Sequence, residues 1–239
     1  MRHGFTSSLL SLNEYTLLME AVDQGYYEIC QLLLENGANP NLTSHGDQTA
    51  LIMAASEQSF ELCKLLVDHG ASVDHAASNG LTPLLCAIRS DSEDSYEKVQ
   101  LFVENGASVN QRIKNGNTPL IEAAEAKNTK TVGYLLQQGA NVHRHDEFGN
   151  TALHRAVEGT PCPSELLELL LDYGADINVE NKDEINPLMM ACSSGNRVNA
   201  LLLANSGANF RNRSGLDSAW NHCPDHVKYH LIRNGYIYY

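Results

Sequence analysis

The sequence is short of positive charge. It has 16 lysine and arginine residues against 29 aspartate and glutamate residues, and its formal net charge is -13. A surface with this excess of negative charge repels phosphate backbones and anionic lipid headgroups. We therefore expect a soluble chain that binds no nucleic acid and does not attach to membrane surfaces.

Long apolar runs are also missing. The stretch Leu166–Leu171 is broken by Glu168, whereas a helix that crosses a bilayer needs about 20 apolar residues in a row. The first twelve residues hold one arginine and too little unbroken apolar sequence for a signal peptide. These absences predict no membrane insertion and a cytoplasmic protein.

Several signatures of reaction chemistry are absent as well. The six cysteines form no CxxC pair, which favours a reducing, intracellular compartment. The glycines keep a repeat spacing and close helices rather than open them, so no phosphate-binding loop is predicted. We expect no cofactor and no resident metal. The cysteines are Cys30, Cys63, Cys86, Cys162, Cys192 and Cys223.

What the sequence does contain is an internal repeat. A Gly-Ala pair recurs, and its glycines are spaced by 33, 36, 33, 35 and 33 residues. A Thr or Asn two residues before a leucine recurs with spacings of 33, 33, 36, 33 and 35. Two independent markers with one period indicate a tandem array. The glycines are Gly37, Gly70, Gly106, Gly139, Gly174 and Gly207, and the second marker begins at Thr16, Thr49, Thr82, Thr118, Thr151 and Asn186.

Each unit is predicted to form two helices and a turn. The threonine can cap the first helix, with proline tolerated directly after it. The second helix has apolar pairs one turn apart and ends at the marker glycine. About a dozen residues rich in Asn, Asp, Gly and Ser then suit a hairpin-like finger. Since one unit cannot bury its leucines alone, neighbours must stack, and Leu66 and Leu135 are predicted core residues.

This pattern resembles the ankyrin repeat. The segment from Gly149 to Ala156, Gly-Asn-Thr-Ala-Leu-His-Arg-Ala, is similar to the family's pattern at almost every position. The resemblance implies an all-α fold with short hairpin fingers, a solenoid of about seven repeats. We expect a single domain over residues 1–239, with an N-terminal extension at 1–12, six recognisable repeats at 13–210, and a degenerate capping repeat at 211–239.

Three segments depart from the pattern. Extra residues within 90–96 and 158–164 are predicted to lie between the two helices of their repeats, away from the fingers. The acidic residues of the first insertion are expected to be a solvated loop. The capping repeat, where Ser218-Ala219-Trp220 matches only loosely, is expected to have a solvated outer face. The acidic residues of the first insertion are Asp91, Glu93, Asp94 and Glu97.

The resemblance also implies where a partner binds, namely a concave surface of finger tips and first helices. Apolar side chains at positions that the fold leaves open to water are the most informative, together with charged residues beside them. For Leu81 and Ile185, packing against a neighbouring finger is an equally good explanation. The predicted partner-binding residues are Met53, Leu81, Cys86, Lys114, Phe148, Arg155, Ile185 and Met190.

A basic patch in the middle fingers is a second candidate. It combines Lys114 with other basic finger residues, and an acidic stretch of a partner would suit it. The remaining members are Arg112, His143, Arg144 and His145.

Catalysis is the competing hypothesis. Cys223, His226 and His230 lie close in sequence, and zinc uses such ligands. However, no CxxC pair accompanies them, and Cys30 and Cys63 are better explained as small buried apolar residues. His154 stands where the family has a structural histidine.

The sequence therefore predicts a non-enzymatic protein-interaction module. It would be an adaptor, scaffold or inhibitor that binds a partner protein or peptide and is a monomer on its own. A bacterial effector that uses the same array inside a host cell remains open, as does the metal- or Cys/His-dependent enzyme centred on the C-terminal segment.

Overall fold

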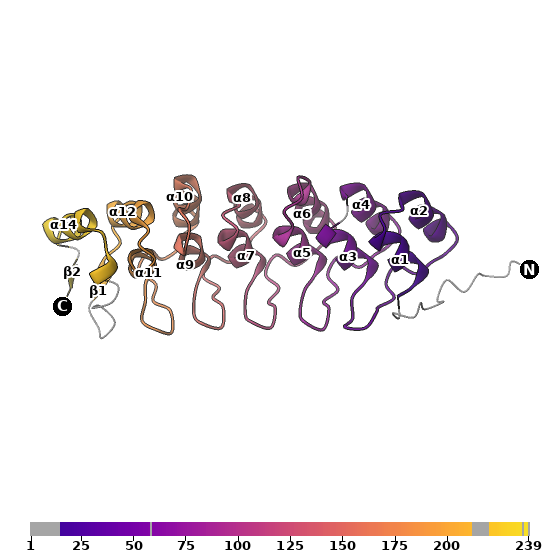
Figure 1. Cartoon of the computed structure of the whole chain (residues 1–239), viewed down its shortest axis with the longest axis horizontal. Coiled ribbons are helices and arrows are strands. Elements are labelled where there is room, and N and C mark those ends of the chain that lie inside the picture. Colours follow the sequence, from indigo (N-terminus) through magenta and orange to yellow (C-terminus); the bar gives the residue numbers. More distant parts are fainter. Residues whose placement is uncertain (1–14, 58, 212–219, 236, 239) are drawn as a thin grey trace, which may run out of the picture. The chain divides into compact units, whose positions relative to one another are not determined.

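The computed structural model describes residues 15–57, 59–211, 220–235 and 237–238, so the predicted extension at 1–12 lies outside it. The chain divides into two compact units that meet between Lys114 and Asn115, and each is described by itself. The first unit holds three helix pairs (Figure 1). They are α1 (Leu17–Asp23) with α2 (Tyr27–Glu35), α3 (Ala50–Glu57) with α4 (Phe60–Asp68), and α5 (Pro83–Arg89) with α6 (Ser95–Glu104).

The second unit repeats this arrangement. Its pairs are α7 (Pro119–Glu125) with α8 (Thr129–Gln137), α9 (Ala152–Val157) with α10 (Ser164–Asp172), and α11 (Pro187–Ser193) with α12 (Arg197–Asn205). The helix α14 (Asp225–Arg233) follows, and the two-residue strands β1 (Phe210–Arg211) and β2 (Ile237–Tyr238) pair in parallel. None of the helices in the described residues has the length and apolar character that crossing a membrane demands.

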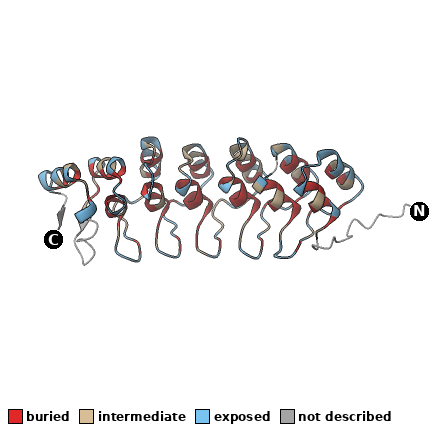
Figure 2. Cartoon of the chain, in the orientation of Figure 1, coloured by how far each residue is buried: buried red, intermediate tan, exposed pale blue. Residues whose placement is uncertain are grey.

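The helices of each unit form two layers, with the core between them. First helices pack on first helices, as in α1, α3 and α5, and second helices pack on second helices, as in α2, α4 and α6. Buried residues face the space between the layers (Figure 2). Leu66 and Leu135 are fully buried, as the sequence predicts. All six cysteines are free and buried, which confirms Cys30 and Cys63 as small core residues.

The predicted helix caps are present. The hydroxyl oxygens of Thr16, Thr82 and Thr118 each accept a hydrogen bond from the backbone N–H three residues later, and the side-chain oxygen of Asn186 does the same. Each cap satisfies an N–H group that has no partner inside its helix. The caps therefore fix where the first helices begin and where the preceding fingers end.

The fingers are hairpin-like, as expected, with isolated antiparallel bridges between Thr43 and Thr49 and between His145 and Thr151. Each finger in the described residues has a residue with a positive φ two positions before the residue that caps the next first helix. Gly149 fills this position with a φ of 85°, and a Cβ atom there would lie 2.7 Å from the backbone nitrogen of Lys182 in the next finger. Glycine is thus required for its conformation and for the close approach of the neighbouring backbone.

Replacing Gly149 tests this close approach. Gly149→Ala should cost more stability than the roughly 1–2 kcal/mol that a left-handed alanine costs, because the neighbouring finger must also move. Gly139→Ala is the matched control, since Gly139 has the same φ of 85° and open space around it. Urea denaturation of both variants measures the difference. Equal losses for the two variants would show that the fingers are not held in contact.

The first insertion is more than a solvated loop. Asp91, Glu93 and Glu97 are exposed, as expected, but Asp94 is not. One of its carboxylate oxygens accepts a hydrogen bond of 2.6 Å from the N–H of Phe60, the first residue of α4. The other lies 2.8 Å from the ammonium nitrogen of Lys98, which is fully buried. Asp94 therefore ties the insertion to the preceding repeat.

The second insertion also lies between the two helices of its repeat. Hydrogen bonds from the next repeat hold it in place. Asn199 on α12 is fully buried. Its side-chain oxygen accepts a hydrogen bond from the N–H of Cys162, and its amide nitrogen donates to the carbonyl of Val157. The extra residues thus extend the contact between adjacent repeats rather than hang free.

The last repeat is degenerate, as predicted. Its residues 212–219, including Ser218 and Ala219, lie outside the described residues. Val227 and Leu231 are buried where α14 packs on α12, and the outer face of α14 is exposed. Tyr229 and Ile232 on α14 are exposed, and the prediction of a capping repeat stays untested. The prediction of a single domain over the whole chain remains untested.

Candidate functional site

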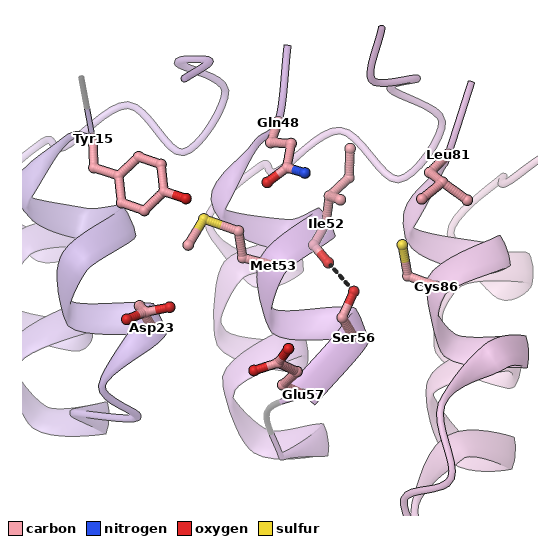
Figure 3. A pocket seen from close by; sticks show the side chains of 9 residues that line it. All are labelled: Tyr15, Asp23, Gln48, Ile52, Met53, Ser56, Glu57, Leu81 and Cys86. Carbon is pink, nitrogen blue, oxygen red and sulfur yellow. Dashed lines mark hydrogen bonds between the residues drawn. The ribbon is translucent and has the colours of Figure 1, made fainter. Parts of the chain in front are cut away.

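A hollow opens on the first-helix side of the first unit, and we call it the groove pocket. Its volume is about 220 Å³. Three adjacent repeats contribute to it, each through the end of a finger or the exposed side of a first helix (Figure 3). Its lining residues are Tyr15, Asp23, Gln48, Ile52, Met53, Ser56, Glu57, Leu81 and Cys86.

Three of the predicted partner-binding residues meet here. Met53 lies on α3, Cys86 on α5, and Leu81 directly before the cap residue Thr82. Met53 and Leu81 are partly exposed, whereas Cys86 is 5% exposed. Burial raises the pKa of the Cys86 thiol, so it serves as an apolar wall rather than a thiolate. The pocket can therefore accept an apolar side chain but has no activated nucleophile.

Polar groups border this apolar centre. Tyr15 and Gln48 lie at the finger end of the pocket, and the carboxylates of Asp23 and Glu57 lie at its opposite end (Figure 3). The hydroxyl of Ser56 donates a hydrogen bond of 3.2 Å to the carbonyl of Ile52, so that hydroxyl proton is occupied. The groove pocket thus offers hydrogen-bonding groups at one end and negative charge at the other.

Sequence reasoning missed the acidic end of the groove pocket. Glu57 lies one helical turn beyond Met53, so it shares a helix face with a predicted partner-binding residue. That spacing was the available signal. What the sequence could not show is that both carboxylates border the same hollow as Leu81 and Cys86.

The candidates of the second unit lie in fingers and on first helices. Phe148 at a finger tip is 55% exposed, and its N–H donates to the carboxylate of Asp146. Ile185 and Met190 are partly exposed. The backbone of Ile185 is engaged in its own finger through a hydrogen bond to Asn181. Phe148 is therefore the most accessible apolar side chain among the predicted residues of this unit.

Arg155 already has partners within the fold. Its guanidinium forms an ion pair with the buried carboxylate of Asp146 and a second one, at 2.8 Å, with Glu158. Burial acts to raise the pKa of Asp146, but hydrogen bonds from Arg155 and from the N–H of Asn150 outweigh it and hold that pKa below the ordinary value. Arg155 therefore stabilises its own finger, and a role in partner binding stays a prediction.

The basic residues of the middle fingers fall in both units. Arg112 and Lys114 are exposed in the first unit, and His143, Arg144 and His145 are exposed in the second. Each group is accessible on its own finger. Their action as one patch stays a prediction.

His154 is fully buried and has a structural role. Its Nδ1 accepts a hydrogen bond from the N–H of Thr151, and its Nε2 lies 3.0 Å from the carbonyl of Ile185 in the next finger. This pattern requires a neutral ring that carries its proton on Nε2. Burial lowers the pKa of His154 below the ordinary value, which keeps the ring neutral.

A dependence of stability on pH follows. Because the pKa of His154 is lower in the fold than in the unfolded chain, its contribution is complete above about pH 6.5 and is lost as the pH falls through the folded-state pKa. Wild type should lose thermal stability between about pH 8 and pH 5. His154→Leu should be less stable at the upper pH and show a shallower decline. Parallel melting profiles of the two proteins would refute this role.

The C-terminal cluster of Cys and His does not come together as a site. The sulfur of Cys223 lies 2.7 Å from that of Cys192, and the hydrogen bond between them, together with burial, raises the pKa of Cys192. His226 accepts from Arg197, and His230 lies beside Asn234. In the part of the chain that the structure describes, no group of three His, Cys, Asp or Glu side chains could hold a metal ion.

Comparison with known proteins agrees with this architecture. A family model described as ankyrin repeats (3 copies) matches residues 18–113, 92–181 and 161–236. The chain belongs to the ankyrin-repeat family. The crystal structure of the ankyrin-repeat domain of Bcl-3, a unique member of the IkappaB protein family, is 30% identical, with a TM-score of 0.69. The match covers 82% of this chain and 85% of that domain.

Two curated ankyrin-repeat relatives match shorter stretches. A putative ankyrin repeat protein of Rickettsia felis is 32% identical over 87 residues, which is 36% of this chain and 23% of that protein. Ankyrin repeat and SOCS box protein 5 of Mus musculus is 39% identical over 69 residues, which is 29% of this chain and 20% of that protein. The matches thus span about a fifth of these relatives' lengths and support the repeat rather than a shared whole-protein activity.

Proposed function

We propose that this ankyrin-repeat protein is a non-enzymatic interaction module that holds a peptide or protein segment against its first helices and fingers. It would act as an adaptor, scaffold or inhibitor. The observation that carries the proposal is the groove pocket, where Met53, Leu81 and Cys86 from adjacent repeats line one hollow. Ankyrin repeats are protein-interaction modules as a family, and the Bcl-3 domain shares this fold.

The physical case rests on rigidity and exposure. The first helices are fixed by caps and by a buried core, so the pocket is largely formed before a partner arrives and binding costs little ordering. The partly exposed Met53 and Leu81 can be buried by a partner, and apolar burial supplies most of the affinity of such contacts. Phe148, at a finger tip of the second unit, is a further anchor.

Selection of short random peptides displayed on phage tests the proposal. We expect wild type to enrich peptides whose binding is abolished by the double variant Met53→Asp, Leu81→Asp. The matched control is Leu32→Asp on α2, whose side chain is 59% exposed on the second-helix layer. It introduces a charge at an accessible apolar residue outside the pocket and should leave binding unchanged. Circular dichroism of each variant checks its fold.

Two results would contradict the proposal. One is a selection in which no peptide is enriched over the background of the empty support. The other is a set of enriched peptides that bind the double variant undiminished, or that are lost with Leu32→Asp. Either would show that the first-helix face of this unit is not the binding surface.

A further inference from the structure

Resting on the proposed function, we infer that the groove pocket takes a partner segment in which a large apolar side chain lies next to a lysine or arginine. The apolar side chain would contact Met53 and Leu81, and the cation would lie at the end bordered by Asp23 and Glu57 (Figure 3). The inference thus specifies which side chains the partner segment carries, in addition to the surface that this segment covers.

The size of the pocket favours side chains of a peptide over a small molecule. Its volume of about 220 Å³ is below the roughly 300–1,000 Å³ of pockets that hold drug-sized ligands. It also stays open at the surface, so a chain can lie across it. Tyr15 and Gln48 at the finger end can exchange hydrogen bonds with the backbone of such a segment.

The apolar centre selects the first of the two side chains. Ile52 and Cys86 are buried and form a fixed apolar wall, while Met53 and Leu81 are only partly covered. A thioether side chain adapts to partners of different shape. The pocket therefore suits a leucine-, methionine- or phenylalanine-sized group without demanding one of them.

The charge of the lining selects the second side chain. Asp23 and Glu57 are exposed carboxylates on α1 and α3, and none of the nine lining residues is basic. Their negative charge attracts a cation and disfavours an acidic partner residue, which gives specificity more than raw affinity. A lysine or arginine also has an apolar stem that can follow the wall while its charged head meets the carboxylates.

A basic residue also lies near the α5 side of the pocket. Arg89 is the last residue of α5, and its charge acts on the thiol of Cys86. It therefore marks the α5 side of the pocket, whereas the two carboxylates belong to α1 and α3. The cation of the partner should consequently lie over α1 and α3, away from Arg89.

Sequencing the peptides that are enriched in the selection described above also tests this inference. Wild type should enrich peptides that carry Lys or Arg within a few positions of a large apolar residue. A synthetic peptide of the enriched sequence should bind Asp23→Asn, Glu57→Gln more weakly by about three- to fivefold in Kd, the range of exposed ion pairs. Its binding to wild type should weaken with added salt, and its binding to the variant much less.

A charge-matched control separates the pocket from the overall charge of the protein. Glu28→Gln, Glu61→Gln removes the same two charges from exposed positions on the second helices α2 and α4. It should leave the Kd within error of wild type. An equal loss in both double variants would mean that only net charge matters and would overturn the inference.

The inference and the proposed function fail in different ways. Enriched peptides that depend on Met53 and Leu81 but lack basic residues, or that bind Asp23→Asn, Glu57→Gln as well as wild type, would overturn the inference and leave the proposed function intact. Peptides whose binding does not depend on Met53 and Leu81 would overturn both the inference and the proposed function.

Discussion

Leu66→Ala is expected to lower the free energy of unfolding by about 2–5 kcal/mol. Leu66 is fully buried in α4, between the two helix layers of the first unit. Truncation removes its apolar contacts and leaves a cavity that rigid neighbouring repeats cannot close. Urea denaturation followed by circular dichroism would show a transition at a clearly lower urea concentration. Leu135, equally buried on α8, should behave alike in the second unit.

The control for this prediction lies on the second helix of the preceding repeat. Leu32→Ala on α2 truncates a leucine whose side chain is 59% exposed, and its effect should stay within about 0.5 kcal/mol. Similar losses for Leu32→Ala and Leu66→Ala would contradict the two-layer core.

The ion pair between Asp94 and Lys98 carries the second large effect. Asp94→Asn keeps an oxygen that can accept from the N–H of Phe60, but it leaves the buried ammonium of Lys98 without its countercharge. Removing one partner of a buried pair typically costs about 3–5 kcal/mol. Since the Asp94 side chain is 29% exposed, we expect about 2–3 kcal/mol at neutral pH, where solvent reduces the full penalty.

A double variant separates the charge from the packing. Asp94→Asn, Lys98→Met replaces the buried ammonium by an apolar side chain of similar length, so most of the loss should be recovered. Urea midpoints of the two single variants and the double variant give the coupling between the residues. Additive losses would show that the pair does not interact.

Much of this fold could be predicted because the repeat encodes it locally. The threonines that mark each unit do cap the first helices, and the Gly-Ala markers do end the second ones, since both features depend on residues only a few positions apart. Asp94 shows where this reasoning ends. Its sequence neighbours are exposed acids, and although Lys98 is only four residues away, the burial of Lys98 and the hydrogen bond from Phe60 to Asp94 depend on the packing of α6 against α4.

The candidate site could be predicted only in part for the same reason. The family pattern selected Met53, Leu81 and Cys86 one at a time, but their convergence on one hollow depends on neighbouring repeats packing side by side. Arg155 illustrates the opposite outcome. It occupies a position open to a partner, yet Asp146, nine residues earlier, turns back in the finger and pairs with it. Position in the repeat thus predicts which face a residue lies on. It does not predict whether a charged side chain already forms an ion pair within the fold.

Hydrogen–deuterium exchange of the chain with and without a selected peptide tests the central claim most directly. If the first helices and fingers are the binding surface, added peptide should slow exchange in α1, α3, α5 and the fingers that precede α3 and α5, while α2, α4 and α6 keep their rates. Slowed exchange confined to the second helices α2, α4 and α6 would contradict the account.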